Sequence, residues 1–383
     1  MRLLIFNYEY PPLGGGGGIE TRDLAEELAK RHEVQVITTG FKDLPRKEIQ
    51  NGVTVHRIPV WGRTSLPTAT LSSMLTFFPA AFIYGFFVIF SFKPECINAH
   101  FVIPSGLPAA LLSKLFRIPF VLTLIGGDIY DPSKGISPHK HGLLRFVVGF
   151  VSKCADKLTA ISNDTKKRAI EYHKTSSDIE VIPLGLVPPT VTRISKEELG
   201  WREDFVHLVS IGRLVPRKGY GDLLKSFAKL QNKNSMLHIL GDGPLCTDLK
   251  KEAEELGIQE KVVFHGRVSE EEKYQLLFAS DIYVSASHHE GFGICFLEAM
   301  FAGLPIITTD KGGQTDFLSR DNAVLIPVGD KERLTSAMDE MMVDDNQRET
   351  IGTNNARDVK ELLIDKTAQR YEAIFKSYLK NNG

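Results

Sequence analysis

Two glutamates, Glu290 and Glu298, are the acidic side chains whose spacing most clearly suggests chemistry. A carboxylate accepts hydrogen bonds from two hydroxyl groups well, so both residues suit a ligand that carries many hydroxyls. Gly291 and Gly293 lie between them, and glycines let the backbone approach a ligand closely. These residue types at this spacing predict a site for a sugar or a phosphate.

The elements around the two glutamates support this prediction. Residues 282–285 are a short apolar run, which is typical of a buried parallel strand. From Ile294 the apolar spacing is helical, and Gly303 with Pro305 ends the helix. A glycine turn between a strand's carboxyl end and a helix's amino end is where α/β sheets bind ligands and where the helix dipole favours phosphate.

A glycoside-hydrolase pair is an alternative interpretation of Glu290 and Glu298. Eight residues of helix would separate the two by about 12 Å, although Glu290 is expected to precede the helix. Hydrolase pairs lie roughly 5 to 9.5 Å apart and face one bond. The spacing therefore favours a binding role over a hydrolytic one.

The run HHEGFGICFLEAMFAGLPII, residues 288–307, resembles the donor-site signature of the family 4 glycosyltransferases, which are retaining enzymes of the GT-B fold. The signature is Glu-x7-Glu, and here Gly-Phe-Gly, Glu-Ala-Met and Ala-Gly-Leu-Pro follow in the family's order. The resemblance implies that Glu290 faces the sugar and phosphate of a nucleotide-sugar and that Glu298 accepts hydrogen bonds from ribose hydroxyls. It also implies donor contacts at Gly291, Phe292, Gly293 and Ile294, where free amides suit hydroxyl or phosphate oxygens.

A second loop, residues 212–219, carries the matching cations. Arg213 and Lys218 match the arginine and lysine that grip the donor's pyrophosphate in the family. A guanidinium makes bidentate phosphate contacts and an ammonium is a movable point charge, so the pair suits a leaving diphosphate. Arg217 is expected to face solvent. Gly243, in a Gly-x-Gly-Pro turn, and Arg267, in the run 265–268, are expected to form the pocket for the nucleotide base.

The N-terminal half offers a further glycine loop. Five glycines, residues 14–18, follow a predicted strand at 3–7 and precede a predicted helix. The dinucleotide fingerprint is disfavoured, because no acid closes the second strand at 34–38. The loop resembles the one that lies over the donor phosphates in the family, and Gly16 and Gly17 are the predicted contacts.

Two polar residues follow later strands of this half. His100 ends a predicted strand, and its setting resembles the family's active-site histidine, which implies a catalytic role. Asp128 follows the strand at 120–125 and is a predicted contact to sugar or acceptor. The family more often has His-Gly-x-Asp at this second stretch, and the departure leaves any role for a histidine there in doubt.

The segment 66–92 contains no charged residue. Three interpretations stay open: a buried crossover helix, a surface helix that dips into a membrane, and a true span. The aromatic excess favours membrane contact as a hypothesis.

The overall composition indicates the class of protein. The chain has 383 residues, of which 43% are hydrophobic and 24% charged, with a net charge of −1. These values are typical of a soluble globular protein of two domains and disfavour a nucleic-acid partner. The four cysteines are scattered, which suits reduced cytosolic thiols. No Asp-x-Asp occurs, so we expect no metal and no cofactor beyond the donor substrate.

The predicted fold is α/β of the GT-B type, with two Rossmann-like doubly wound domains facing across a cleft. The predicted bounds are 1–185 for the acceptor-side domain, 186–362 for the donor domain and 363–383 for a helix that crosses back to the first domain. The predicted reaction is retaining, metal-independent transfer of a sugar from a UDP- or GDP-linked donor to an acceptor hydroxyl on a glycan or lipid-linked sugar. A nucleotide-sugar epimerase or hydrolase and a non-catalytic binding protein are the alternatives. The expected location is cytoplasmic, on the inner face of the plasma membrane.

Overall fold

The chain folds into two compact α/β units. The structure is a computed structural model, and it describes residues 1–66, 69–133, 135–232 and 234–380. The first unit comprises residues 1–185 together with the last helix, α12 (Ile364–Lys380), and the second comprises Leu186–Leu363. The chain therefore passes between the units at Gly185–Leu186 and again at Leu363–Ile364.

The first unit is built on a sheet with the strand order β3-β4-β2-β1-β5-β6-β7-β8. All neighbouring strands are parallel except β3, which runs antiparallel to β4 at the edge. The strands are β1 (Arg2–Asn7), β2 (Glu33–Thr39), β3 (Lys47–Gln50), β4 (Val53–Ile58), β5 (Cys96–His100), β6 (Phe120–Leu124), β7 (Lys157–Ala160) and β8 (Ile179–Val181).

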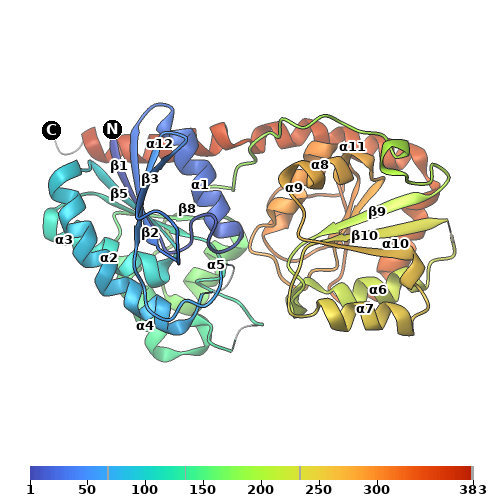
Figure 1. The fold of residues 1–383 in the computed structure, drawn as a ribbon, viewed down its shortest axis with the longest axis horizontal. Helices are drawn as coiled ribbons and strands as arrows, with labels where there is room; N and C mark the ends of the chain where they lie inside the picture. Colours follow the sequence, from blue (N-terminus) through green and yellow to red (C-terminus); the bar gives the residue numbers. More distant parts are fainter. Residues whose placement is uncertain (67–68, 134, 233, 381–383) are drawn as a thin grey trace. The chain divides into compact units, whose positions relative to one another are not determined.

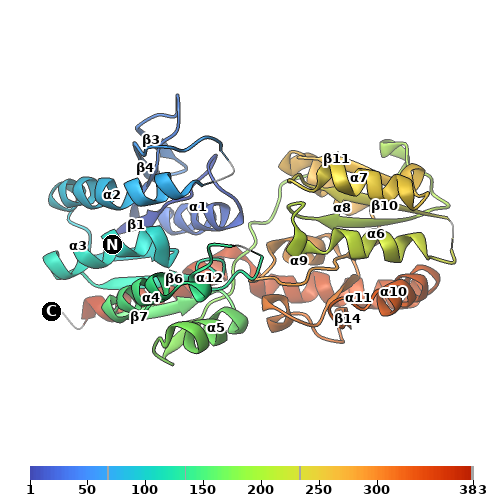
Figure 2. The ribbon, with the colours of Figure 1, turned by 90° about the horizontal axis from the view of Figure 1, so that it is seen from below.

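Helices cover both faces of this sheet (Figure 1). On one face α1 and α12 share an apolar core in which Leu24 and Leu28 meet Tyr371 and Phe375. On the other face α2, α3 and α4 lie side by side, with α5 next to α4 (Figure 2). Right-handed crossovers produce this division, because the chain leaves β1 in one direction along the sheet and β4 in the other. The helices are α1 (Gly16–Ala29), α2 (Leu71–Phe92), α3 (Leu107–Phe116), α4 (Gly142–Cys154) and α5 (Asn163–His173).

The apolar segment 66–92 contains α2, which connects β4 to β5. Thr70 and Ser73 form a capping box that fixes its start. Phe77, Ala81 and Gly85 face the sheet and are buried, while much of the opposite side is exposed. By length and composition α2 passes as a membrane-crossing helix. Because both ends join strands of one sheet and the inner side is packed in the core, the interpretation as a true span is wrong.

The second unit has a parallel sheet with the order β11-β10-β9-β12-β13-β14. Helices α6, α7 and α10 pack their apolar sides on one face, so the core is again a helix–sheet interface. The strands are β9 (Val206–Ile211), β10 (Ser235–Leu240), β11 (Val262–Gly266), β12 (Ile282–Val284), β13 (Ile306–Thr309) and β14 (Val324–Ile326). The helices are α6 (Tyr220–Ala228), α7 (Cys246–Glu255), α8 (Glu270–Ala279), α9 (Ile294–Ala302), α10 (Lys331–Val343) and α11 (Asp345–Asp358).

Three histidines on β9, β10 and β11 form a hydrogen-bonded row. His207 Nδ1 lies 3.0 Å from His238 Nε2, and His238 Nδ1 lies 3.0 Å from His265 Nε2. Trp201 stacks on the first two rings. His207 Nε2 is 3.0 Å from the Arg202 carbonyl, which only accepts, so neutral Nε2–H tautomers satisfy the whole row. Burial lowers the pKa of all three imidazoles, that of His238 to about 3.

This row predicts acid sensitivity of the second unit. Unfolded histidines bind protons near pH 6.5 and the folded ones do not, so stability is full above that pH and falls as the pH drops toward 3. The limiting slope is about 1.4 kcal/mol per pH unit for each histidine. Urea unfolding at several pH values, followed by Trp201 fluorescence in a Trp61→Phe background, measures it. His238→Phe should flatten the dependence, and an unchanged slope would contradict the assignment.

Candidate functional site

The candidate site lies where the strand order of the second sheet reverses. From β9 the chain proceeds to β10 and β11 on one side, whereas β12 and β13 lie on the other. The carboxyl ends of β9 and β12 are therefore neighbours at a switch point, where open α/β sheets bind ligands. Arg213 and Lys218 lie in the loop after β9, and Glu290 lies in the loop after β12.

Backbone contacts lock these loops together. His288 N donates to the Arg217 carbonyl at 2.8 Å. Gly219 has a φ of +65°, and a Cβ there would lie 2.0 Å from the Ala286 carbonyl oxygen, so only glycine fits. Gly313 N, after β13, donates to the Glu290 carbonyl at 2.9 Å. The position of Glu290 is thus fixed by three loops of one sheet edge.

The Glu290 carboxylate is buried among cations. Lys218 Nζ donates to Oε1, Arg217 lies 3.5 Å from Oε2, and the Ser287 hydroxyl donates to Oε1 at 3.0 Å. Burial alone would raise the pKa of Glu290, but Lys218 and Arg217 outweigh it and hold that pKa below its usual value. The expectation that Arg217 faces solvent is wrong, because its guanidinium also donates to the His289 carbonyl at 3.0 Å.

Glu298 lies on α9 and pairs with Lys273, a residue that was not predicted from the sequence. Lys273 Nζ, from α8, is 2.6 Å from Glu298 Oε1 and 2.7 Å from Glu270 Oε2. Burial raises the pKa of Glu298, and Lys273 opposes that shift. The signal was present in the sequence: Lys273 precedes Leu276 and Leu277 by three and four residues, which places it on the inward side of α8.

Cys295 lies on α9 between Glu290 and Glu298 in the sequence. Its thiol is buried, and burial is the main cause that raises its pKa to about 11. The charges of Lys218, Glu290 and Glu298 also affect the pKa of this thiol. Cys295 is therefore a neutral, unreactive thiol at neutral pH. Of the residues predicted to hold the donor, the structure pairs Lys218 directly with Glu290, whereas Glu298 pairs with Lys273.

Replacing Lys273 should expose the cost of burying Glu298. We expect Lys273→Met to lower the free energy of unfolding by about 3–5 kcal/mol, because it leaves a buried carboxylate without its cation. Lys251→Met is the matched control, since Lys251 is exposed and pairs along α7 with Glu255, its one ion-pair partner among the described residues. Urea unfolding at pH 7 measures both, and equal losses for the two variants would contradict the pairing.

The other predicted donor contacts surround the same sheet edge. Arg213 is exposed at the start of the loop after β9, and Arg267 is exposed after β11. Gly243 belongs to the turn after β10, where a Cβ would lie 2.4 Å from the Leu214 carbonyl oxygen, so this turn packs directly on the Arg213 loop. Arg213, Gly243 and Arg267 thus follow the adjacent strands β9, β10 and β11.

The turn 291–294 leads directly into α9 and buries the side chain of Phe292. Gly293 precedes α9 with a φ of +91°, and Ile294 begins the helix. The ring of Phe292 is buried and packs on Phe317 at a centroid distance of 4.8 Å. A ligand would therefore meet the backbone of this turn rather than the phenyl ring.

In the first unit Gly16 and Gly17 belong to α1 itself, because the helix begins at Gly16. A Cβ on Gly17 would lie 2.4 Å from the Phe101 ring, whereas Gly16 is open to solvent. The predicted loop is thus partly a helix amino end at the edge of β1, which suits a phosphate.

His100 is fully buried at the end of β5. Nδ1 lies 3.0 Å from the Thr21 hydroxyl and 3.2 Å from Glu20 Oε2, and Nε2 lies 2.8 Å from Asn98 Oδ1. Tyr371 of α12 stacks on the ring. Both ring nitrogens have protein partners, so the catalytic role stays a prediction that requires this network to open.

Asp128 is also engaged within the first unit. One oxygen accepts from Val102 N at 2.7 Å and the other from Ile125 N at 3.1 Å. Burial raises its pKa to about 6. The carboxylate fixes two loops, and a contact to sugar or acceptor stays a prediction.

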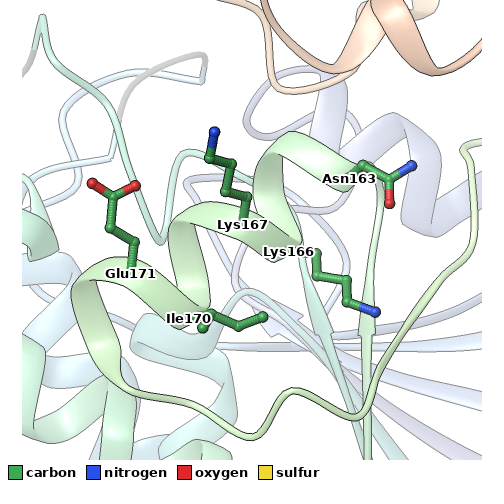
Figure 3. A pocket seen from close by; sticks show the side chains of 5 residues that line it. All are labelled: Asn163, Lys166, Lys167, Ile170 and Glu171. Carbon is green, nitrogen blue, oxygen red and sulfur yellow. The ribbon is translucent and has the colours of Figure 1, made fainter.

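An open depression of about 570 Å³ runs along α5, and none of the predicted site residues lines it. Figure 3 shows its lining side chains, Asn163, Lys166, Lys167, Ile170 and Glu171. Among the residues that the structure describes, no group of three or more His, Cys, Asp or Glu side chains is placed to hold a metal ion.

Comparisons with known proteins identify the family of the chain. A family model described as "Glycosyl transferase 4-like domain" matches residues 15–185, and one described as "Glycosyl transferases group 1" matches residues 191–358. The chain belongs to the family 4 glycosyltransferases, and it is a glycosyltransferase with the GT-B fold.

Relatives and solved structures extend over nearly the whole chain. The chain is 28% identical to the N-acetyl-α-D-glucosaminyl L-malate synthase of Bacillus anthracis, over 100% of this chain and 99% of that protein. It is also 28% identical to an uncharacterized glycosyltransferase of Methanocaldococcus jannaschii, over 94% of each. The structure of the sucrose-phosphate synthase of Thermosynechococcus elongatus superposes with a TM-score of 0.82, at 17% identity and 99% coverage of both chains. This last likeness shows the shared fold.

Proposed function

We propose that the protein is a retaining glycosyltransferase that moves a sugar from a UDP- or GDP-linked donor to an acceptor hydroxyl on a lipid-linked or cell-surface glycan precursor. The observation that carries the proposal is the Lys218–Glu290 pair at the β9/β12 switch point, with Arg213 on the same loop. A cation and a carboxylate held side by side suit the two halves of a sugar diphosphate, which are anionic and rich in hydroxyls.

Donor binding would exchange the partners of this pair. The diphosphate would take the place of Glu290 on Lys218 and would receive a bidentate contact from Arg213. Glu290 would then accept hydrogen bonds from the sugar, and Glu298 from the ribose. Amides of the turn 291–294, which precede the amino end of α9, would supplement the positive charge. Gly16, Gly17, His100 and Asp128 are proposed to contribute from the first unit.

The proposed reaction needs no metal. The bond between the anomeric carbon and the phosphate oxygen breaks, and the acceptor oxygen bonds to that carbon on the same face. The acceptor proton passes to the departing phosphate oxygen. The negative charge that develops on the diphosphate would be met by Arg213, Lys218 and the loop amides, a preorganised electrostatic contribution.

We also propose that the enzyme works in the cytoplasm, as a peripheral protein on the inner face of the plasma membrane. Support comes from α2, whose outward side exposes Leu75, Ile83 and Phe87. Such a location would bring the enzyme to a lipid-linked acceptor.

A ligand panel tests the donor. Thermal shifts with UDP, GDP, ADP and their sugar conjugates should identify one nucleotide, because a ligand at 100 times its dissociation constant adds about 2.7 kcal/mol to the folded state. With that donor and an acceptor, NMR should show a product with the donor's anomeric configuration, also in EDTA. Inversion of configuration, or donor consumption that needs no acceptor, would contradict the proposal.

A further inference from the structure

The outward faces of α2, α3 and α4 form a surface that the donor site does not use. On α2 an exposed stripe recurs every four residues: Leu71, Leu75, Pro79, Ile83 and Phe87. The side chains of Leu75 and Phe87 are each 66% exposed. Apolar side chains at this spacing lie along one side of a helix, so α2 presents a continuous apolar line to solvent.

The neighbouring helices also carry apolar side chains. Phe116, at the end of α3, packs against Phe90 of α2 at a centroid distance of 5.4 Å. On α4, Leu143 is 75% exposed and Phe146 is 69% exposed. Figure 2 shows the three helices in one layer over the sheet. Exposed apolar side chains gathered on neighbouring helices of one layer indicate an interaction site.

The charges of this layer are all of one sign. The helices α2, α3 and α4 contain no Asp or Glu. Four exposed cations lie at the carboxyl ends of these parallel helices, on the same side of the sheet. A fifth lies in the first turn of α4. Among the described residues none of them forms an ion pair. They are Lys93, Lys114, Arg117 and Lys153 at the helix ends, and Arg145 on α4.

The acids that follow these helices most closely in the chain offset only part of the positive charge. Glu95 accepts a hydrogen bond from Arg2 N at 2.8 Å, and Asp156 accepts one from Phe120 N at 2.8 Å. Both carboxylates still carry their negative charge, but the four cations at the helix ends outnumber these two acids. The cluster therefore keeps an excess of positive charge beside the apolar side chains.

The exposed apolar side chains and the positive charge together indicate which kind of partner this face binds. A second copy of the chain would bring two acid-free, cationic faces together, which like-charge repulsion disfavours. A bilayer with anionic headgroups matches both the apolar side chains and the cations. Insertion across the bilayer is excluded, because a Cβ at Gly85 would lie 2.7 Å from Leu112 and 2.9 Å from Phe6, so α2 is held tightly against its own sheet.

We propose that the α2–α4 face docks on the surface of an anionic lipid bilayer. Phe87, Phe90 and Phe146 enter the boundary between headgroups and acyl chains, and the cations at the helix ends contact lipid phosphates. This deepens the peripheral-membrane part of the proposed function, and it holds whichever sugar the enzyme transfers.

Vesicle flotation tests the proposal without any donor. The full chain should float with phosphatidylcholine vesicles that contain roughly one-third phosphatidylglycerol, and should stay in solution with pure phosphatidylcholine. Raising the salt from about 0.15 M to about 1 M should weaken binding strongly, because the screening length falls from about 8 to 3 Å. In a Trp201→Phe background, emission of Trp61, which lies beside Thr76 of α2, should shift to the blue on binding.

Matched variants separate the apolar and ionic contributions. Lys114→Gln with Arg117→Gln should weaken binding about 25-fold, at about five-fold for each cation. Phe87→Ser with Phe146→Ser should abolish flotation. The control pair Arg320→Gln with Lys360→Gln removes the same charges from the second unit and should bind like the wild type. Thermal unfolding verifies that each variant is folded.

Three outcomes would overturn the proposal. Failure to float with any vesicle would remove the bilayer as the partner, and equal binding to neutral vesicles would remove the anionic headgroup. A concentration-dependent dimer that Phe87→Ser with Phe146→Ser dissolves would assign the face to a second copy. None of these results would affect donor binding, so the donor-site proposal stands or falls separately.

Discussion

Replacing Arg213 by alanine is expected to lower the transfer rate by about 100- to 1,000-fold, the loss that follows removal of one preorganised group that stabilises developing negative charge. Arg213 lies on the loop after β9, beside Gly212 and five residues before Lys218. In the proposed reaction its guanidinium would contact the diphosphate most strongly as the sugar departs. The measurement is release of nucleoside diphosphate at saturating donor and acceptor.

A conservative variant sharpens this prediction. Arg213→Lys keeps the charge but loses the planar fork, so its rate should fall between those of the wild type and Arg213→Ala. Arg267→Ala removes an exposed arginine that is expected to contact the base, and should raise KM with little change in kcat. Near-normal transfer by Arg213→Ala would contradict the phosphate assignment.

The second large effect is expected at Glu290. Glu290→Gln should abolish transfer and lower the free energy of unfolding by about 3–5 kcal/mol, because Lys218 and Arg217 lose their buried partner. The pKa of Glu290 lies below its ordinary value of 4.5 in the folded state. The carboxylate's stabilising contribution is therefore present above pH 4.5 and is lost as the pH falls below it.

A double variant separates stability from activity. Lys218→Met with Glu290→Gln removes both members of the pair, and replacing a buried ion pair by neutral groups is often neutral for stability. We expect urea unfolding to show recovery of most of the stability lost in Glu290→Gln, without recovery of transfer. An active double variant would show that this pair does not hold the donor.

Much of the fold followed from the sequence because periodicity encodes burial. Runs such as 120–124, which are apolar except for Thr123, are typical of strands covered by helices on both faces, and this run forms the interior strand β6 of the first sheet. The edge strand β3 was missed, since Lys47–Gln50 has polar residues and no apolar run. Helix α11 was missed for the same reason, because its fourteen residues bury only Ile351, Gly352 and Asn355.

Those parts of the candidate site that are contiguous in the sequence could be predicted. Glu290 and the turn 291–294 are contiguous, so their placement before α9 could be predicted. The partners of the carboxylates come from other elements: Lys273 from α8, and Arg217 from the loop after β9. Such pairings depend on strand order, which one sequence does not display. The burial of His100 under Tyr371, 271 residues later, could not be anticipated for the same reason.

The position of α12 in the chain has a consequence for protein synthesis. Tyr371 and Phe375 complete the core that β1 and α1 begin, so this core is completed only after the whole second unit has been translated. The second unit, Leu186–Leu363, has all of its strands before α12 is made. The donor-site half can therefore fold during translation while the half translated earlier still exposes one side of its sheet.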